Sequence, residues 1–224
     1  ENNPDDINSA LAYMNRDQYG DWEILNWSST IKRSENTNWK RYTLTKNNPA
    51  FNEQMNFFID YQIKEMYFRY FAWQFIGKGD KDEHPWYIKD LNGNLIGNQR
   101  LDGIDFFRYG LPLAFLLGVL GVFFHFKNDW QRALSVLSLF LATGLMIIIY
   151  LNQYDPQPRE RDYSYVGSFF AFSIWIGIGL FSILDKIKKI FRKSNISAFI
   201  CLPIIIIFLM MPVKMLATDY MEHN

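Results

Sequence analysis

The chain has 224 residues, of which 49% are hydrophobic and 18% aromatic, and its 23 basic residues balance its 23 acidic ones. This balance excludes the strongly basic surface that nucleic-acid-binding proteins carry, so no nucleic-acid partner is expected. The single cysteine, Cys201, excludes an intrachain disulfide and a thiolate metal cluster.

Residues 1–108 are mostly polar and slightly acidic. Residues 39–45 are expected to form a short strand, and the Asn92-Gly93 pair is typical of a hairpin turn. His84 has acidic neighbours but no second histidine at a ligand spacing, so no metal site is expected.

Residues 52–76 are predicted to form one helix that ends before Gly77, because aromatic side chains alternate there with charged ones. Charged residues such as Lys64, Glu65 and Arg69 exclude a membrane span in this segment. Two placements remain open: an amphipathic helix packed on protein, or a helix that lies on a bilayer surface.

Four apolar runs follow, and each is about as long as the roughly 17–25 residues that a bilayer requires. They cover residues 109–126, 133–151, 165–184 and 196–213. The predicted fold class is therefore mainly α, a polytopic membrane protein with four transmembrane helices. Glycines in two of the runs are expected to permit close helix packing: Gly118, Gly121, Gly177 and Gly179. No ionisable residue lies in the middle of a run, which argues against a transporter.

The short polar links between the runs predict the orientation. Link 185–195 carries five basic residues against one acidic residue, and link 127–132 adds Lys127 and Arg132. The positive-inside rule places both links in the cytoplasm. Residues 1–108, the loop 152–164 and the tail from residue 214 are then expected on the periplasmic face of the inner membrane.

The loop 152–164 holds the candidate site residues. Arg159 and Arg161 are separated by one residue and flanked by Asp155, Glu160 and Asp162. Guanidinium groups bind phosphate in a bidentate manner and keep their charge, so this pattern favours a grip on a lipid-linked phosphate. Tyr163 is expected beside the headgroups. In the alternative reading, the arginines pair with neighbouring acids or anionic lipid and only fix the loop.

The stretch 150–169, with Asp-Pro-Gln-Pro-Arg-Glu-Arg-Asp at positions 155–162, resembles a bacterial family of large membrane proteins. This is the protein O-mannosyltransferase-like family, which is abundant in Bacteroidota. The stretches 11–20, 52–61 and 66–73 carry the same resemblance, which covers essentially the whole chain in order.

The resemblance implies a GT-C type glycosyltransferase that passes a mannose-like sugar from a polyprenyl-phosphate carrier to protein hydroxyls outside the cytoplasm. Its expected partners are membrane lipids, the lipid-linked sugar and an acceptor protein, with no cofactor. The catalytic carboxylate of such enzymes lies in the first external loop. We expect this chain to be a middle portion without that loop, so the catalytic residue stays unknown. The competing hypothesis is a non-catalytic scaffold in a cell-envelope complex, with residues 1–108 as its binding surface.

Overall fold

The structure is a computed structural model that describes residues 7, 11, 25–34, 38–44, 46–78, 88–89, 95–96, 103–104, 109, 111–155, 157, 161–190 and 196–222. Within these ranges the chain is mainly helical, as predicted. Besides one long helix, the described part before the apolar helices contains α2 (Trp27–Arg33), the 3₁₀ turn η2 (Asn38–Arg41), and a two-stranded ribbon of β1 (Ile88–Lys89) and β2 (Leu95–Ile96).

The long helix predicted for residues 52–76 is confirmed. It runs without a break through α3 (Phe51–Asn56), η3 (Phe57–Phe68) and α4 (Arg69–Phe75). Glu53 fixes its start, because the carboxylate accepts hydrogen bonds from the backbone nitrogens of Leu44 and Ala50 at 2.8 and 2.7 Å. The 12 residues of η3 form a π-helix, whose i→i+5 hydrogen bonds wind more residues into each turn than an α-helix does.

The strand expected at residues 39–45 is wrong, and the hairpin is confirmed. The Trp39 carbonyl accepts hydrogen bonds from the backbone nitrogens of Tyr42 and Thr43, which closes a 3₁₀ turn instead of an extended segment. Strands β1 and β2 pair antiparallel, with Ile88 opposite Ile96, so the pairing is centred on residue 92. The turn itself and His84 lie outside the described residues.

Four apolar helices lie where the four runs predicted them. They are α5 (Leu113–Asn128), α6 (Trp130–Thr143) with its continuation α7 (Leu145–Leu151), α8 (Val166–Ile190) and α9 (Ile196–Glu222); the 3₁₀ turn η4 (Asp162–Tyr165) leads into α8. By length and composition, two helices can cross a membrane, Trp130–Leu151 with 22 residues and Asp162–Ile190 with 29. The α5 helix has 16 residues, and the apolar stretch of α9 is Ile205–Ala217.

The end of α9 differs from the prediction. The helix contains Pro203 and Pro212 and continues to Glu222, so it includes most of the tail that was expected to be a separate polar segment. A proline inside a helix removes one backbone hydrogen bond but does not have to end the helix in an apolar environment.

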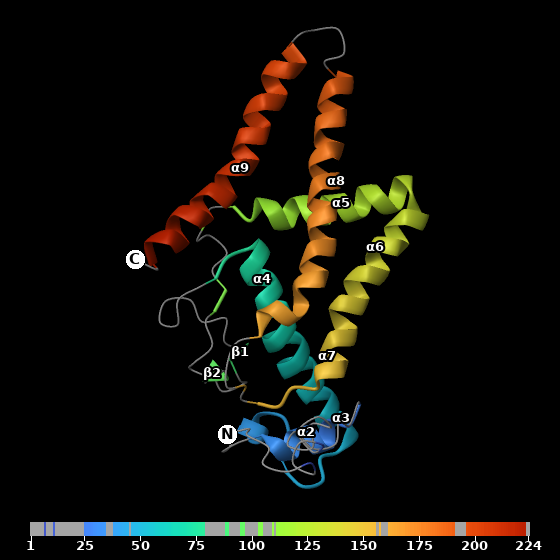
Figure 1. The fold of residues 1–224 in the computed structure, drawn as a ribbon, viewed down its shortest axis with the longest axis vertical. Coiled ribbons are helices and arrows are strands. Elements are labelled where there is room, and N and C mark those ends of the chain that lie inside the picture. Colours follow the sequence, from blue (N-terminus) through green and yellow to red (C-terminus); the bar gives the residue numbers. More distant parts are fainter. Residues whose placement is uncertain are drawn as a thin grey trace.

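Helices α5 and α8 cross each other (Figure 1) and touch backbone to backbone. A Cβ atom at Gly121 would lie 1.8 Å from the Trp175 carbonyl oxygen, and one at Gly179 would lie 2.0 Å from that of Leu117. A Cβ atom at Gly118 would lie 2.2 Å from the Phe172 ring. The prediction of close packing is therefore confirmed for these three glycines. It is wrong for Gly177, whose Cβ position has no other atom within 4 Å.

The long helix packs on protein, which decides between its two predicted placements. The Phe71 ring centroid lies 4.8 Å from that of Phe172 in α8, 6.1 Å from Phe140 in α6 and 6.5 Å from Phe115 in α5. Every residue of α4 except Gln74 is buried. Described residues of the segment 1–108 and of the apolar helices thus belong to one aromatic core.

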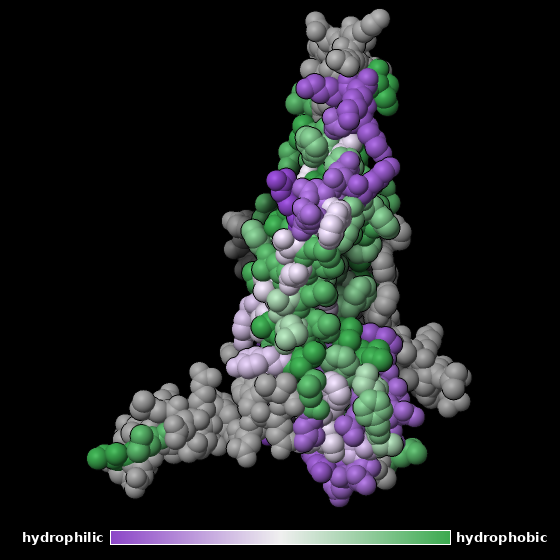
Figure 2. All heavy atoms as spheres, turned by 90° about the vertical axis from the view of Figure 1, so that its right-hand side faces the viewer, coloured by the Kyte–Doolittle hydropathy of each residue, from purple (hydrophilic) through white to green (hydrophobic). Residues whose placement is uncertain are grey.

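The two ends of α8 face opposite parts of the molecule. Its basic C-terminal end, with Lys188 and Lys189, lies far from α2 and α3 (Figure 1). On the face shown in Figure 2, hydrophobic side chains lie between hydrophilic groups that gather toward the two ends. Large apolar side chains of the α6–α7 helix are exposed, including Leu141 at 42% and Met146 at 60%. Such a surface is what a lipid-facing helix presents.

Candidate functional site

The site begins where the α7 helix ends. Asn152 takes the left-handed conformation, with φ of 39°, which asparagine tolerates better than most residues and which stops the helix. Its side-chain oxygen accepts a hydrogen bond from Gln62 Nε2 at 2.9 Å, and its amide nitrogen donates to the Asn26 carbonyl at 3.4 Å. The turn out of the apolar helix is therefore tied to both η3 and the start of α2.

From there the loop follows the long helix in the same direction. Gln62 Nε2 donates to the Gln153 carbonyl at 3.0 Å, and the Tyr61 hydroxyl donates to the Tyr154 carbonyl at 2.9 Å. Further along, the backbone nitrogen of Arg161 donates to the Tyr70 hydroxyl at 3.3 Å. We use the name polar layer for the polar side chains of this loop and of the segments that it contacts: Arg41, Tyr42, Glu65, Arg69, Gln153, Asp155 and Arg161.

Asp155 is the most buried member of the polar layer, at 1% exposure. Its Oδ2 atom accepts a hydrogen bond from the Tyr42 hydroxyl at 3.1 Å and forms an ion pair with Arg41 Nη1 at 3.4 Å. Burial, together with the charges of Glu65 and Asp155, raises the pKa of Tyr42 well above its ordinary value, so this hydroxyl keeps its proton and remains a donor. A buried charge held in this way is costly to leave unpaired.

Glu65 is a second carboxyl group in the same layer. Burial and the nearby Asp155 charge raise its pKa from 4.5 to about 7, against the opposite effect of Arg41 and Arg69. Its Oε2 atom is buried and has no hydrogen-bond partner among the residues that the structure describes. A carboxyl group that titrates near neutral pH can take up or release a proton during a reaction.

Two further side chains of the layer have buried polar atoms without partners. Gln153 is 5% exposed, and neither its amide oxygen nor its amide nitrogen forms a hydrogen bond with a described residue. The Nε atom of Arg161 is also buried and has no partner within the described ranges. Because buried polar atoms are nearly always paired in folded proteins, these atoms are candidates to bond water or a polar ligand.

Arg69 adds a fixed positive charge. Its Nε atom donates to the Glu65 carbonyl at 2.9 Å, and its guanidinium carbon lies 4.6 and 4.4 Å from the ring centroids of Tyr70 and Trp73. Trp73 is held in turn by a 2.8 Å hydrogen bond to the Gly103 carbonyl. Stacking on two rings fixes the orientation of a guanidinium group and compensates in part for its burial.

The structure does not bring all of the predicted site residues together. Asp155 and Arg161 belong to the polar layer. Asp162 accepts a hydrogen bond from the backbone nitrogen of Tyr163 at 2.9 Å, and the Tyr163 side chain is 57% exposed. Arg159 and Glu160 lie outside the described residues.

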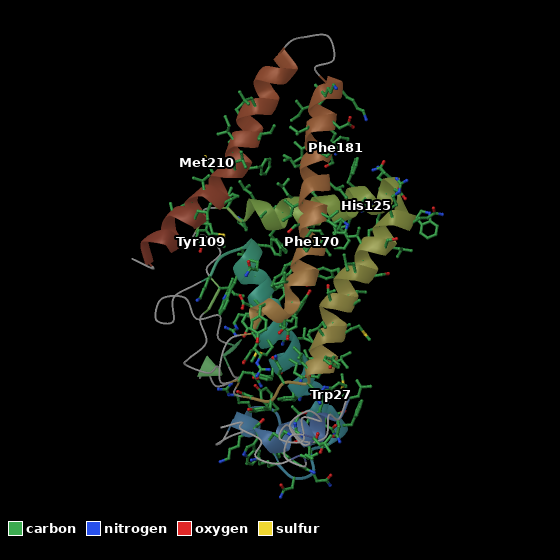
Figure 3. The ribbon with its side chains drawn as sticks, viewed as in Figure 1. Trp27, Tyr109, His125, Phe170, Phe181 and Met210 are labelled. Carbon is green, nitrogen blue, oxygen red and sulfur yellow. The ribbon has the colours of Figure 1, made fainter. Side chains whose placement is uncertain are left out.

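Asp162 instead lines a cavity of about 270 Å³ between the end of α4 and the start of α8. The other lining residues are apolar or uncharged: Gln74, Phe75, Val166, Phe169, Phe170 and Ser173. Figure 3 labels Phe170 on α8 at the level of the C-terminal end of α4.

Sequence reasoning missed Arg41, Glu65, Arg69 and Gln153 as members of the site. The charged residues of the long helix were interpreted only as its polar face. Their sequence separation from the loop gives no signal, because the contacts join residues about 90 to 114 positions apart. The π-helical winding of η3 also changes which side chains share a face, and a pattern based on 3.6 residues per turn does not show it.

Within the part of the chain that the structure describes, no group of three or more histidine, cysteine, aspartate or glutamate side chains could hold a metal ion. Comparison with known proteins found no matching family model, no similar curated protein and no similar solved structure.

Proposed function

We propose that this chain is part of a membrane glycosyltransferase that transfers a sugar, mannose or a close relative, from a polyprenyl-phosphate carrier to protein hydroxyls. The polar layer would bind the phosphate and the sugar of the donor. The proposal extends the sequence resemblance, and its main structural support is the buried Nε atom of Arg161, which bonds no group in the described part of the chain.

A phosphate ester fits the polar layer chemically. Phosphate oxygens accept hydrogen bonds, and an arginine with a free N–H group is a strong donor to them. Among the described residues no carboxylate pairs with the Arg161 guanidinium, so this group can donate to a phosphate. Glu160, a partner in the alternative reading, lies outside those residues. Sugar hydroxyls both donate and accept, so they match the free amide of Gln153 and the free oxygen of Glu65.

The charge of the layer suits a dianionic or monoanionic donor. Arg41, Arg69 and Arg161 contribute three positive charges, and Asp155 contributes one negative charge. Glu65, with a pKa of about 7, contributes up to one more. The layer thus has an excess of positive charge, and Glu65 is placed to exchange a proton as the acceptor hydroxyl is consumed.

The location of the layer fits a donor that stays in the bilayer. Its loop connects the two helices that are long and apolar enough to cross a membrane. The sequence predicts four spans, but α5 has 16 residues and lies across α8 (Figure 1), so we propose that α9 is a third span and that α5 packs across α8 within the apolar region. The basic end of α8 would lie in the cytoplasm. The polar layer would then lie on the periplasmic side, where lipid-linked sugars are used.

The test is sugar transfer in membranes that contain the full-length protein. Arg161→Ala is expected to lower transfer from a polyprenyl-phosphate sugar about 10- to 150-fold, from the roughly 1.5–3 kcal/mol that a charged hydrogen bond contributes. Arg132→Ala is the matched control. The Arg132 side chain is 86% exposed and pairs with Asp129 at the N-terminal end of the α6–α7 helix, whereas the loop follows the C-terminal end. Normal transfer by Arg161→Ala, at a normal protein level, would remove the phosphate role.

The scaffold hypothesis is supported by a different observation. The hydrogen bonds of Tyr42, Tyr61 and Gln62 to the loop would be equally useful in a rigid platform without activity. Deletion of the gene separates the two functions. Loss of glycans from envelope proteins favours the transferase, and an unchanged glycan profile together with loss of a co-purifying partner favours the scaffold.

A further inference from the structure

The cavity between α4 and α8 combines an apolar interior with a polar edge. Phe75 and Phe169 are buried, at 7% and 8% exposure, and form its floor. Val166 and Phe170 are 56% and 62% exposed, although they lie on a helix that is long and apolar enough to cross a membrane. In a bilayer, the molecules that reach such an opening are lipids, because water is absent from the hydrocarbon core.

The polar edge has a defined hydrogen-bonding character. Asp162 Oδ1 accepts a hydrogen bond from its neighbour Tyr163, and its Oδ2 atom has no donor among the described residues. The Ser173 hydroxyl donates to the Phe169 carbonyl at 2.9 Å, so its own oxygen can still accept. Gln74 is the exposed residue of α4. A negatively charged acceptor at the rim favours a ligand that donates hydrogen bonds, and it disfavours a bare anion.

The size of the cavity limits the ligand further. Its volume of about 270 Å³ lies below the roughly 300–1,000 Å³ of pockets that enclose whole small molecules. One section of a hydrocarbon chain fits, with the remainder of the ligand in the bilayer and at its surface.

We propose that this cavity is a lipid-binding site, in which one hydrocarbon chain packs on Phe75 and Phe169 and a headgroup with N–H or O–H donors binds Asp162. The inference does not depend on the transferase activity. Two sources offer this chemistry: a phospholipid with an ammonium headgroup, and an isoprenoid alcohol or its glycosylated form.

The experiment is native mass spectrometry of the full-length protein released from nanodiscs. One set contains phosphatidylethanolamine, whose ammonium group donates hydrogen bonds, and a second contains phosphatidylcholine of the same chains, whose headgroup has no donor. Wild-type protein is expected to retain at least about threefold more of the first lipid, from a difference of about 0.7 kcal/mol or more in binding. A competition arm adds a polyprenol to both sets.

Two variants on α8 test the location. Ser173→Phe fills the cavity and is expected to abolish the extra retained lipid. Gly177→Phe is the matched control, one turn further along, where a side chain has open space and no cavity to fill. Asp162→Asn, which keeps the acceptor bonded to Tyr163 and removes the charge, is expected to equalise the two phospholipids, whereas Asp185→Asn at the other end of α8 leaves the preference intact.

Each outcome has a definite meaning. Displacement of the phospholipid by polyprenol supports the site and identifies an isoprenoid source, and retention of the phospholipid identifies a phospholipid source. Equal retention of both phospholipids by wild-type protein overturns the headgroup contact. Lipid retention that is the same in wild type and Ser173→Phe overturns the site itself. Sugar-transfer activity is not the readout, so failure here leaves the transferase proposal to its own test.

Discussion

The polar layer and the α5–α8 crossing hold the same molecule together in opposite ways. In the polar layer, side-chain interactions join the chain segments. Examples are the hydrogen bond from Tyr42 to Asp155 and the ion pair of Arg41 with Asp155. At the crossing, side chains are absent, and the backbones of Gly121 and Gly179 lie against the carbonyls of Trp175 and Leu117. The first contact is directional and depends on charge, and the second depends on shape alone.

The difference indicates where each contact can work. Between apolar helices in lipid there is little hydrophobic driving force, so close backbone approach supplies the packing energy. Near the aqueous face, polar groups of the loop can be bonded to side chains of a neighbouring helix. Variants that affect only one of these regions should therefore show different dependence on charge, pH and side-chain volume.

The largest effect is expected from removal of Asp155. Asp155→Ala leaves Arg41 buried without its ion-pair partner and Tyr42 without an acceptor, which should lower the free energy of unfolding by about 3–5 kcal/mol. The apparent melting temperature in mild detergent measures it. The control is Asp185→Ala, which removes an exposed partner of Lys189 and should cost about 0–1 kcal/mol. Equal shifts in both variants would contradict a special role of the buried pair.

The second prediction concerns pH and Glu65. Its folded pKa of about 7 exceeds the ordinary value of 4.5, so the folded state binds the proton more tightly than the unfolded state. The contribution of this group to stability is therefore greatest below pH 4.5 and falls as the pH rises to about 7, by at most about 3 kcal/mol.

Glu65→Gln mimics the protonated form at every pH. Relative to wild type, it should melt at a higher temperature at pH 8 and at nearly the same temperature at pH 4.5. The control is Gln54→Glu, which places a carboxyl group on the same long helix but outside the polar layer. A difference between Glu65→Gln and wild type that does not change with pH would exclude the raised pKa.

The third prediction tests the crossing. Gly121→Ala places a methyl group where the Trp175 carbonyl oxygen lies, and the helices must separate. Overpacking of this kind costs about 1–3 kcal/mol. Gly177→Ala introduces the same atom into open space and should be neutral or stabilising, because alanine is the better helix former. Neither variant should alter the pH dependence of melting, and a change there would connect the two regions.

The smallest effect is expected at the end of α7. Asn152→Gly keeps the left-handed backbone and removes the side-chain hydrogen bonds to Gln62 and Asn26. This loss should lower the free energy of unfolding by about 1 kcal/mol. Asn152→Leu adds backbone strain to the same loss and should melt lower still. Hydrogen exchange of the loop backbone would reveal the local opening directly. Equal melting of wild type and Asn152→Gly would mean that the side chain contributes nothing.

The helices were predictable because their signals are local. Apolar runs gave the positions of α5 to α9, and the glycines of α5 indicated a close crossing, although only contact geometry distinguishes Gly179 from Gly177. Asp155 and Arg161 were recognised from their loop sequence. Glu65 and Arg41 were not, because a charge looks the same in sequence whether it faces solvent or a buried carboxylate. The 3₁₀ turn at Trp39 was missed for a related reason: Tyr42 is drawn inward by its distant contact with Asp155.

The π-helix η3 makes the chain unusually sensitive to length. Its 12 residues lie between the Glu53 start of the helix and the aromatic residues of α4, and both ends are fixed by tertiary contacts. Each residue turns an α-helix by about 100°, and the wider π-helical turn rotates by less for each residue. A one-residue deletion within η3 would therefore rotate Phe71 away from Phe172, or Glu65 away from Asp155, whichever residue is removed. Insertions and deletions, more than substitutions, should be the changes that this segment does not tolerate.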